Sequence, residues 1–182
     1  MVINTHRMLC ANQQMIAQIL RFLSLEKPVL LDWLPWSHTF GGNHNVNIVL
    51  KHGGTLYIDD GRPLPGAIDK TIAHLKEVQP TVYFNVPKGY DMMLPALEKD
   101  AKFAKRFFEK LRMVFYAGAG MPQTTWKRLE AVAQGLVTGF SSSIEEDEEQ
   151  AGINPEVAAA FAEEIAKISD SLTKTNQQLV EL

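Results

Sequence analysis

The 182-residue sequence has few of the features that secreted or membrane-spanning proteins need. Cys10 is the only cysteine, so an internal disulfide cannot form, and no CxxC pair marks a redox or zinc motif. The chain has no uninterrupted apolar run of about eighteen residues, and its start lacks the charged and then apolar pattern of a signal peptide. We therefore expect a cytoplasmic protein that does not enter a membrane, with Cys10 as a small buried residue.

Metal-binding and nucleic-acid-binding patterns are also missing. The five histidines include no HExxH pair, and His38 and His44 lack the cysteine or carboxylate spacing of a zinc site. Basic residues such as Lys102, Lys105 and Arg106 are spread along a predicted helix with few aromatic side chains between them. We expect neither a metal site nor nucleic-acid binding.

What the sequence does contain is a globular composition with an uneven charge. It is 46% hydrophobic, which suits one domain with a real core. Residues 1–143 hold 16 basic and 11 acidic side chains, whereas residues 144–182 hold 2 and 10. We therefore predict a domain over residues 1–143, followed over residues 144–182 by an acidic loop and a helical tail.

Short β-branched and aromatic runs alternate with helical apolar stripes along the domain. The runs predict strands at residues 29–34, 55–58, 81–86, 112–117 and 136–140, with helices before and between them. This alternation is typical of a mostly parallel sheet with helices on its faces. We predict an α/β fold, part of a doubly wound sheet, plus a C-terminal amphipathic helix.

That C-terminal helix is predicted to begin at Asn154-Pro155 and to run nearly to the end of the chain. Its apolar residues form one stripe, comprising Val157, Phe161, Ile165, Ile168 and Leu172. Such a stripe must be buried against the domain or a partner. We expect self-association through this helix, residues 154–181, or through an exposed edge of the sheet.

The densest polar and aromatic chemistry lies between Asp32 and Asn45, directly after a predicted strand. Ligands of α/β folds bind at such strand ends. Pro35 and the Gly41-Gly42 pair disfavour a regular helix or central strand. The loop could line a cavity with Trp36, His38 and Phe40, or it could be a strand-to-helix connection with Trp33 and Trp36 in the core and His38 as a helix cap.

A second segment, Tyr116 to Pro122, places small residues directly after another predicted strand. Small residues allow a planar group to lie against the backbone. A plain tight turn is the alternative, because Gly118-Ala119-Gly120 lacks the third glycine of a dinucleotide-binding fingerprint.

Four segments, in the same order and at similar spacing, resemble the adenylate-forming acyl- and aryl-CoA synthetases, most closely the feruloyl-CoA synthetase branch. They are LPWSHTFGG (residues 34–42), GGTLYIDDGRP (53–63), PTVYFNVPKGYDMML (80–94) and LRMVFYAGAGMPQTTWKRLEAVA (111–133). The resemblance covers about residues 2–140, and collinearity over that length is more specific than any single motif.

The resemblance implies a chemistry and a set of binding residues. Enzymes of this family use ATP and Mg²⁺ to join a carboxylic acid to AMP and then pass the acyl group to coenzyme A. The acid implied here is a small aromatic one of the hydroxycinnamate type. The matching positions are His38 and Phe40 in the acyl or aryl pocket, Ala117, Gly118 and Ala119 on the wall shared with adenine, Gly120 on the substrate side of that turn, and Arg7 beside the pocket.

The sequence also departs from the family's pattern. The resemblance would place the phosphate loop immediately before Val2, and residues 139–145 only echo the Gly-x-Thr-Glu segment that contacts nucleotide and metal. The later catalytic lysine has no recognisable counterpart. We expect the acyl-binding part of a ligase that is inactive alone, with no catalytic residue assigned; the alternative is a remnant domain that binds aryl acids or a protein partner.

Overall fold

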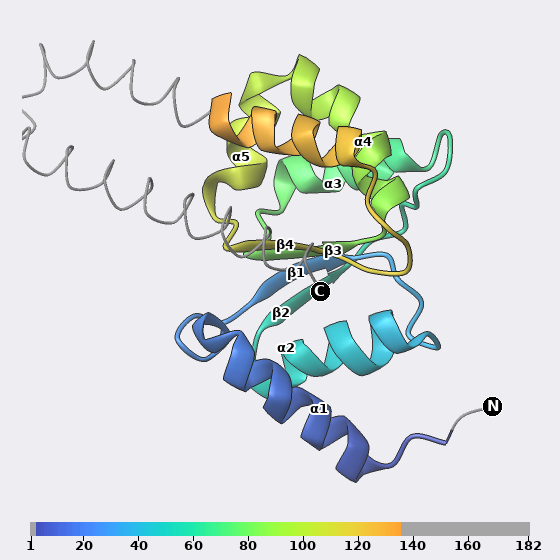
Figure 1. The fold of residues 1–182 in the computed structure, drawn as a ribbon, viewed down its shortest axis with the longest axis vertical. Coiled ribbons are helices and arrows are strands. Elements are labelled where there is room, and N and C mark those ends of the chain that lie inside the picture. Colours follow the sequence, from blue (N-terminus) through green and yellow to red (C-terminus); the bar gives the residue numbers. More distant parts are fainter. Residues whose placement is uncertain (1–2, 136–182) are drawn as a thin grey trace, which may run out of the picture. The chain divides into compact units, whose positions relative to one another are not determined.

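The computed structural model describes residues 3–135 (Figure 1). The predicted strand at residues 136–140, the domain boundary at residue 143 and the helix from Asn154 lie outside this range. A last helix covers residues 123–135. The elements before it are α1 (His6–Ile19), η1 (Arg21–Ser24), β1 (Val29–Asp32), η2 (Thr39–Val46), α2 (Asn47–His52), β2 (Thr55–Ile58), α3 (Ile68–Glu77), β3 (Val82–Asn85), α4 (Pro87–Lys99), α5 (Ala101–Glu109) and β4 (Met113–Tyr116).

All four strands run in the same direction. β1 pairs in parallel with β2, and β3 pairs in parallel with β4. Thr81 joins the beginnings of β1 and β3, since its N–H donates to the Val29 carbonyl at 2.9 Å. At the other end, the Trp33 indole N–H donates to Asn85 Oδ1 at 3.1 Å. The segments that follow the strands therefore gather at one edge, as the α/β prediction requires.

Helices cover both faces of these strands, and the side chains of β3 show why. Figure 1 shows α1 and α2 on one face, with α3, α4, α5 and the helix over residues 123–135 on the other. Alternate side chains of a strand point to opposite faces. Val82 and Phe84 accordingly join the core under α2, while Tyr83 joins the core under α4 and α5. The predicted fold class, α/β with parallel strands and flanking helices, is confirmed, and within residues 3–135 the strands form two small sheets, β1–β2 and β3–β4.

Local signals set two of the helix boundaries. Thr5 caps α1 by accepting the Met8 N–H, and Gly53, in the left-handed region at φ 63°, ends α2. One expectation was wrong: Cys10 is exposed on α1 because the buried side of that helix passes through Leu9 and Gln13 instead. Among residues 3–135, no helix is long and apolar enough to cross a membrane.

Replacing Gly89 by alanine should destabilise the fold although alanine favours helices. Gly89 lies in the first turn of α4, where an added Cβ would overlap the amide of Asn85. That amide is fully buried and held by Trp33, Tyr83 and the Val86 N–H. We expect a loss of about 1–3 kcal/mol in the free energy of unfolding, measured by chemical denaturation. Lys99→Ala, at an exposed position of the same helix, is the control; equal stability of both variants would contradict this packing.

Candidate functional site

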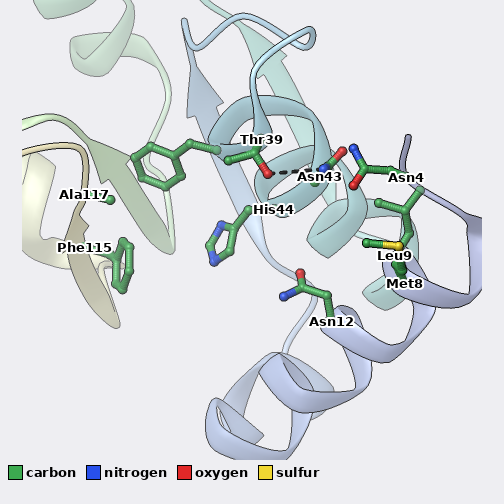
Figure 2. Close-up of a pocket in the computed structure, with 10 residues that line it drawn as sticks. Asn4, Met8, Leu9, Asn12, Thr39, Asn43, His44, Phe115 and Ala117 are labelled. Atoms are coloured by element: carbon green, nitrogen blue, oxygen red, sulfur yellow. Dashed lines mark hydrogen bonds between the residues drawn. The ribbon is translucent and has the colours of Figure 1, made fainter. Parts of the chain in front are cut away.

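A pocket of about 410 Å³ lies beside the residues that follow β1 and β4 (Figure 2). We call it the Phe40 pocket. One wall comes from the beginning of the chain and α1, one from η2, and one from the end of β4. Its lining residues are Asn4, Met8, Leu9, Asn12, Thr39, Phe40, Asn43, His44, Phe115 and Ala117.

The wall from η2 is a wide helical turn that the sequence prediction missed. Residues Thr39–Val46 form a π-helix that continues into α2, although the Gly41-Gly42 pair argued against a helix here. The glycines are needed for close packing, because a Cβ on Gly41 or Gly42 would overlap the backbone carbonyls of Pro35 and Trp36. The close contact of these glycines with the backbone of Pro35 and Trp36 holds η2 against the segment that follows β1. π-Helical turns are frequent at functional sites.

His38 begins this helix. Its Nδ1 atom accepts the Phe40 N–H at 3.2 Å, so the ring acts as the helix cap that was one of the two interpretations of the sequence. The side chains of His38 and Trp36 are both exposed, so the core position that this interpretation gave Trp36 is wrong. The other interpretation, a cavity lined by Trp36, His38 and Phe40 together, is therefore correct only for Phe40.

Aromatic rings form the inner wall of the Phe40 pocket. Phe40 is only 8% exposed and meets Phe84 and Phe115 edge-on, at centroid distances of 6.2 and 6.0 Å. His44 stacks on Phe115 with an interplanar angle of 22° and a centroid distance of 5.7 Å. Flat, largely apolar walls of this kind suit a planar ring, which gains from both burial and ring contacts.

A chain of buried polar groups runs from His44 toward the end of β1. His44 Nδ1 lies 2.8 Å from Asn45 Oδ1, and Asn45 Nδ2 donates to Asp32 Oδ2 at 2.8 Å. Asp32 Oδ1 accepts the Leu34 N–H at 2.9 Å. Burial lowers the pKa of His44, against an opposing effect of its hydrogen bond to Asn45, and burial raises the pKa of Asp32. The lowered pKa of His44 favours the uncharged imidazole on the pocket wall.

Gln13 ties α1 to the same helix. Its side-chain amide donates to the carbonyls of Asn43 and His44, at 3.1 and 3.3 Å, and the residue is only 4% exposed. Its Oε1 atom is buried without a hydrogen-bond partner among the described residues. These bonds fix the α1 wall of the pocket relative to η2.

The predicted binding residues are only partly brought together. Phe40 and Ala117 line the Phe40 pocket, as Figure 2 shows for Ala117. The turn after Ala117, Gly118-Ala119-Gly120, is exposed beside it, with Gly118 at φ 93°. Arg7 and His38 are exposed and do not line the pocket. The binding roles of all these residues remain predictions.

Sequence reasoning missed His44 and the residues contributed by α1. His44 lies four residues after Phe40, so the two rings share a face only if the segment is helical. A prediction of helix at residues 39–46 would have placed His44 beside Phe40. Asn4, Met8 and Asn12 recur at the same four-residue spacing, but nothing local says that this face meets η2.

A second polar cluster lies after β2. The Asp59 oxygens accept from the Gly61 N–H, the Thr71 hydroxyl and His74 Nδ1, at 2.8, 2.6 and 2.8 Å. Asp59, Asp60 and His74 are close enough to hold a cation together. Because three donors already occupy Asp59, the cluster is explained as an anchor that holds the loop after β2 against α3.

Solved structures with a similar fold are known. Among solved structures, the fold resembles a malonyl-CoA ligase in a ternary product complex with methylmalonyl-CoA and AMP, with a TM-score of 0.53, 21% identity, and coverage of 68% of this chain and 25% of that chain. A structure of CmiS6 gives a TM-score of 0.47 and 18% identity, covering 64% of this chain and 27% of that one. The chain thus spans about a quarter of each of these structures.

No curated protein matches the sequence. The AMP-binding enzyme family matches it over residues 1–142, which is most of the chain. The chain therefore belongs to the AMP-binding enzyme family.

Proposed function

We propose that this chain carries the acyl-binding part of an ATP-dependent acid–CoA ligase, and that the Phe40 pocket takes the ring of a small aromatic acid of the hydroxycinnamate or feruloyl type. The observation that carries the proposal is the meeting of two segments, one after β1 and one at the end of β4, around a pocket walled by Phe40, His44 and Phe115. The same two segments bear the resemblance to aryl-CoA synthetases.

The shape and polarity of the pocket support an aromatic ligand. A ring can lie between aromatic side chains, while the small Ala117 leaves space at the end of β4. On the other side, the side chains of Asn4, Asn12, Asn43 and Thr39 offer hydrogen bonds to ring substituents. Neutral polar groups in a mostly apolar pocket give orientation without the cost of burying charge.

In the proposed enzyme the nucleotide would bind beside this pocket. Gly118-Ala119-Gly120 follows the pocket residue Ala117 directly, so adenine on that turn and the acid in the pocket would share the Ala117 wall. His38 would act from the exposed side of η2, and Arg7 from the exposed side of α1. ATP, Mg²⁺ and coenzyme A are the cofactors proposed for the complete enzyme. The 182-residue polypeptide, by itself, is proposed to bind the acid without activating it.

A remnant domain with a protein partner is the second candidate, and one observation favours it. Tyr57 and Ile58 on β2 are 45% and 70% exposed. In the described part of the chain, β2 pairs only with β1, so its other edge offers free backbone groups for another strand. The self-association expected through a sheet edge would use this surface.

Filling the pocket should weaken aryl-acid binding. In Ala117→Leu, a longer side chain would occupy the space next to Phe115, and a cost of about 1–3 kcal/mol, as for overpacking, corresponds to roughly a 5- to 150-fold loss of affinity. Isothermal titration of ferulate into the 182-residue protein and into the variant measures this effect. The control is Ala131→Leu, the same change at an exposed helical position away from the pocket. Equal ferulate affinity of Ala117→Leu and wild type would reject the pocket as the acid site.

A further inference from the structure

The hydrogen bonds beneath the Phe40 pocket specify which nitrogen of His44 carries a proton. Asp32 accepts from the Leu34 N–H with one oxygen and faces the Asn45 amide with the other, 2.8 Å away. A carboxylate can only accept, so Asn45 must present its NH₂ group to Asp32 and its oxygen to His44. The reverse orientation would place two oxygen acceptors against each other inside the core, where Asn45 is fully buried.

The imidazole tautomer follows from this orientation. Asn45 Oδ1 can only accept, and it lies 2.8 Å from His44 Nδ1, so Nδ1 must be the protonated nitrogen. Burial lowers the pKa of His44 and thereby favours the neutral ring. In a neutral ring with a proton on Nδ1, the Nε2 atom is a hydrogen-bond acceptor.

The Nε2 atom is available to a ligand. His44 lines the Phe40 pocket, and within residues 3–135 its Nε2 has no hydrogen-bond partner. Among residues 3–135, the polar side-chain atoms that are fully buried and lack a partner are Gln13 Oε1 and His52 Nε2, so the Nε2 atom of His44 keeps some accessible surface. An accessible acceptor on an aromatic wall is a feature that a bound ring can match with a donor substituent.

We propose that Asp32 and Asn45 are positioning residues that hold His44 in the Nδ1–H tautomer, so that the pocket selects aromatic acids bearing a hydrogen-bond donor on the ring. A phenolic hydroxyl satisfies Nε2 by donating to it. A methyl ether at the same ring position offers only an acceptor. Its oxygen cannot pair with Nε2, and the two acceptors repel each other if they meet. The ligand class rests on the proposed function, whereas the positioning role does not.

The isosteric variant Asp32→Asn should invert the whole chain of bonds. The new amide oxygen can still accept the Leu34 N–H, which leaves its NH₂ group facing Asn45. Asn45 must then turn its oxygen toward residue 32 and its NH₂ toward His44 Nδ1. That nitrogen becomes the acceptor, and the proton moves to Nε2. The pocket wall changes from an acceptor to a donor without a change in its volume.

Imidazole ¹⁵N chemical shifts test the positioning role without any ligand, because protonated and unprotonated ring nitrogens have separate shift ranges. In the wild-type 182-residue protein we expect His44 to have a protonated Nδ1 and an unprotonated Nε2. We expect the assignment to reverse in Asp32→Asn. Asn45→Ala is the second variant, for use if Asp32→Asn does not fold. It leaves His44 Nδ1 without its acceptor, so the chemical shift of a protonated Nδ1 should be lost.

Titrations with 4-hydroxycinnamate and 4-methoxycinnamate test the selection. The wild type should prefer the hydroxyl compound by about tenfold or more, as expected for one buried hydrogen bond, and Asp32→Asn should lose this preference. The control is Asp59→Asn, the same change at a buried carboxylate whose partners are Gly61, Thr71 and His74. It should leave both the tautomer and the preference unchanged.

Three results would overturn the proposal: a wild-type His44 protonated on Nε2, an Asp32→Asn variant that keeps the Nδ1–H tautomer, or an Asp59→Asn variant that shifts tautomer and preference equally. Failure of both cinnamates to bind the wild type would reject the proposed function and the selection with it. The ¹⁵N shifts would then still decide whether Asp32 and Asn45 position His44.

Discussion

Phe40→Ala is expected to lower the free energy of unfolding by about 3–5 kcal/mol, a large share of the stability of a domain of this size. Phe40 belongs to the core under α2 and meets three aromatic rings, those of His44, Phe84 and Phe115. Its removal would leave a cavity between η2 and the strands. Chemical denaturation followed by tryptophan fluorescence measures the change.

The matched control is Trp36→Ala, because Trp36 lies in the same segment and was predicted to share a cavity with Phe40. Its side chain is 56% exposed, so its loss should change stability by only about 0.5 kcal/mol. If the two variants were equally stable, η2 would not pack against β3 and β4 as described.

No pyrophosphate release above background is expected from the 182-residue polypeptide with ferulate, ATP, Mg²⁺ and coenzyme A. Adenylyl transfer needs fixed positive charge around the phosphates, and losing a single oxyanion-type donor typically costs about 10²–10³ in rate. The lining of the Phe40 pocket holds no lysine, arginine or carboxylate side chain, and burial lowers the pKa of its one histidine, His44. Under the proposed function this surface takes the ring of the acid, and its lining offers no lysine or arginine to a triphosphate.

A complete adenylate-forming ligase, assayed in parallel with its own substrate, shows that the assay detects turnover. The second control is Ala117→Leu, in which the pocket is filled. Pyrophosphate release by the wild-type polypeptide that exceeds release by Ala117→Leu would contradict the prediction. It would mean that this chain assembles a nucleotide site outside the described pocket.

The sequence predicted the elements whose signals are local. β2 was predicted at residues 55–58 and is found at Thr55–Ile58, because a β-branched and aromatic run there follows two glycines. Gly53 ends α2, since a left-handed residue at that point favours glycine. The parallel arrangement followed from the alternation of strands and helices.

Elements that depend on contacts between distant residues were not predictable. Gly41 and Gly42 argue against a helix by propensity, yet η2 forms because those residues must approach the backbone of Pro35 and Trp36. Gln13 is a polar residue on an amphipathic helix, and it is buried because η2 offers two carbonyls thirty residues away in the sequence. Packing of this kind overrides local preference.

The candidate site also contains both residues that local motifs predicted and residues whose roles depend on distant contacts. Phe40 and Ala117 were found from motifs that follow strands, and they line one pocket. His44 was not predicted as a binding residue, because its place on the pocket wall requires the unexpected helix. Asp32 and Asn45 bounded the segment of interest, but their hydrogen bond exists only after η2 folds back on β1.

The position of a bound aryl acid tests the central claim most directly. Intermolecular nuclear Overhauser effects between ferulate ring protons and the side chains of the ¹³C-labelled 182-residue protein report that position. We predict contacts to Phe40, Phe115 and Ala117. Contacts instead to Tyr57 and Ile58 on the exposed face of β2, with none to the Phe40 pocket, would contradict the account.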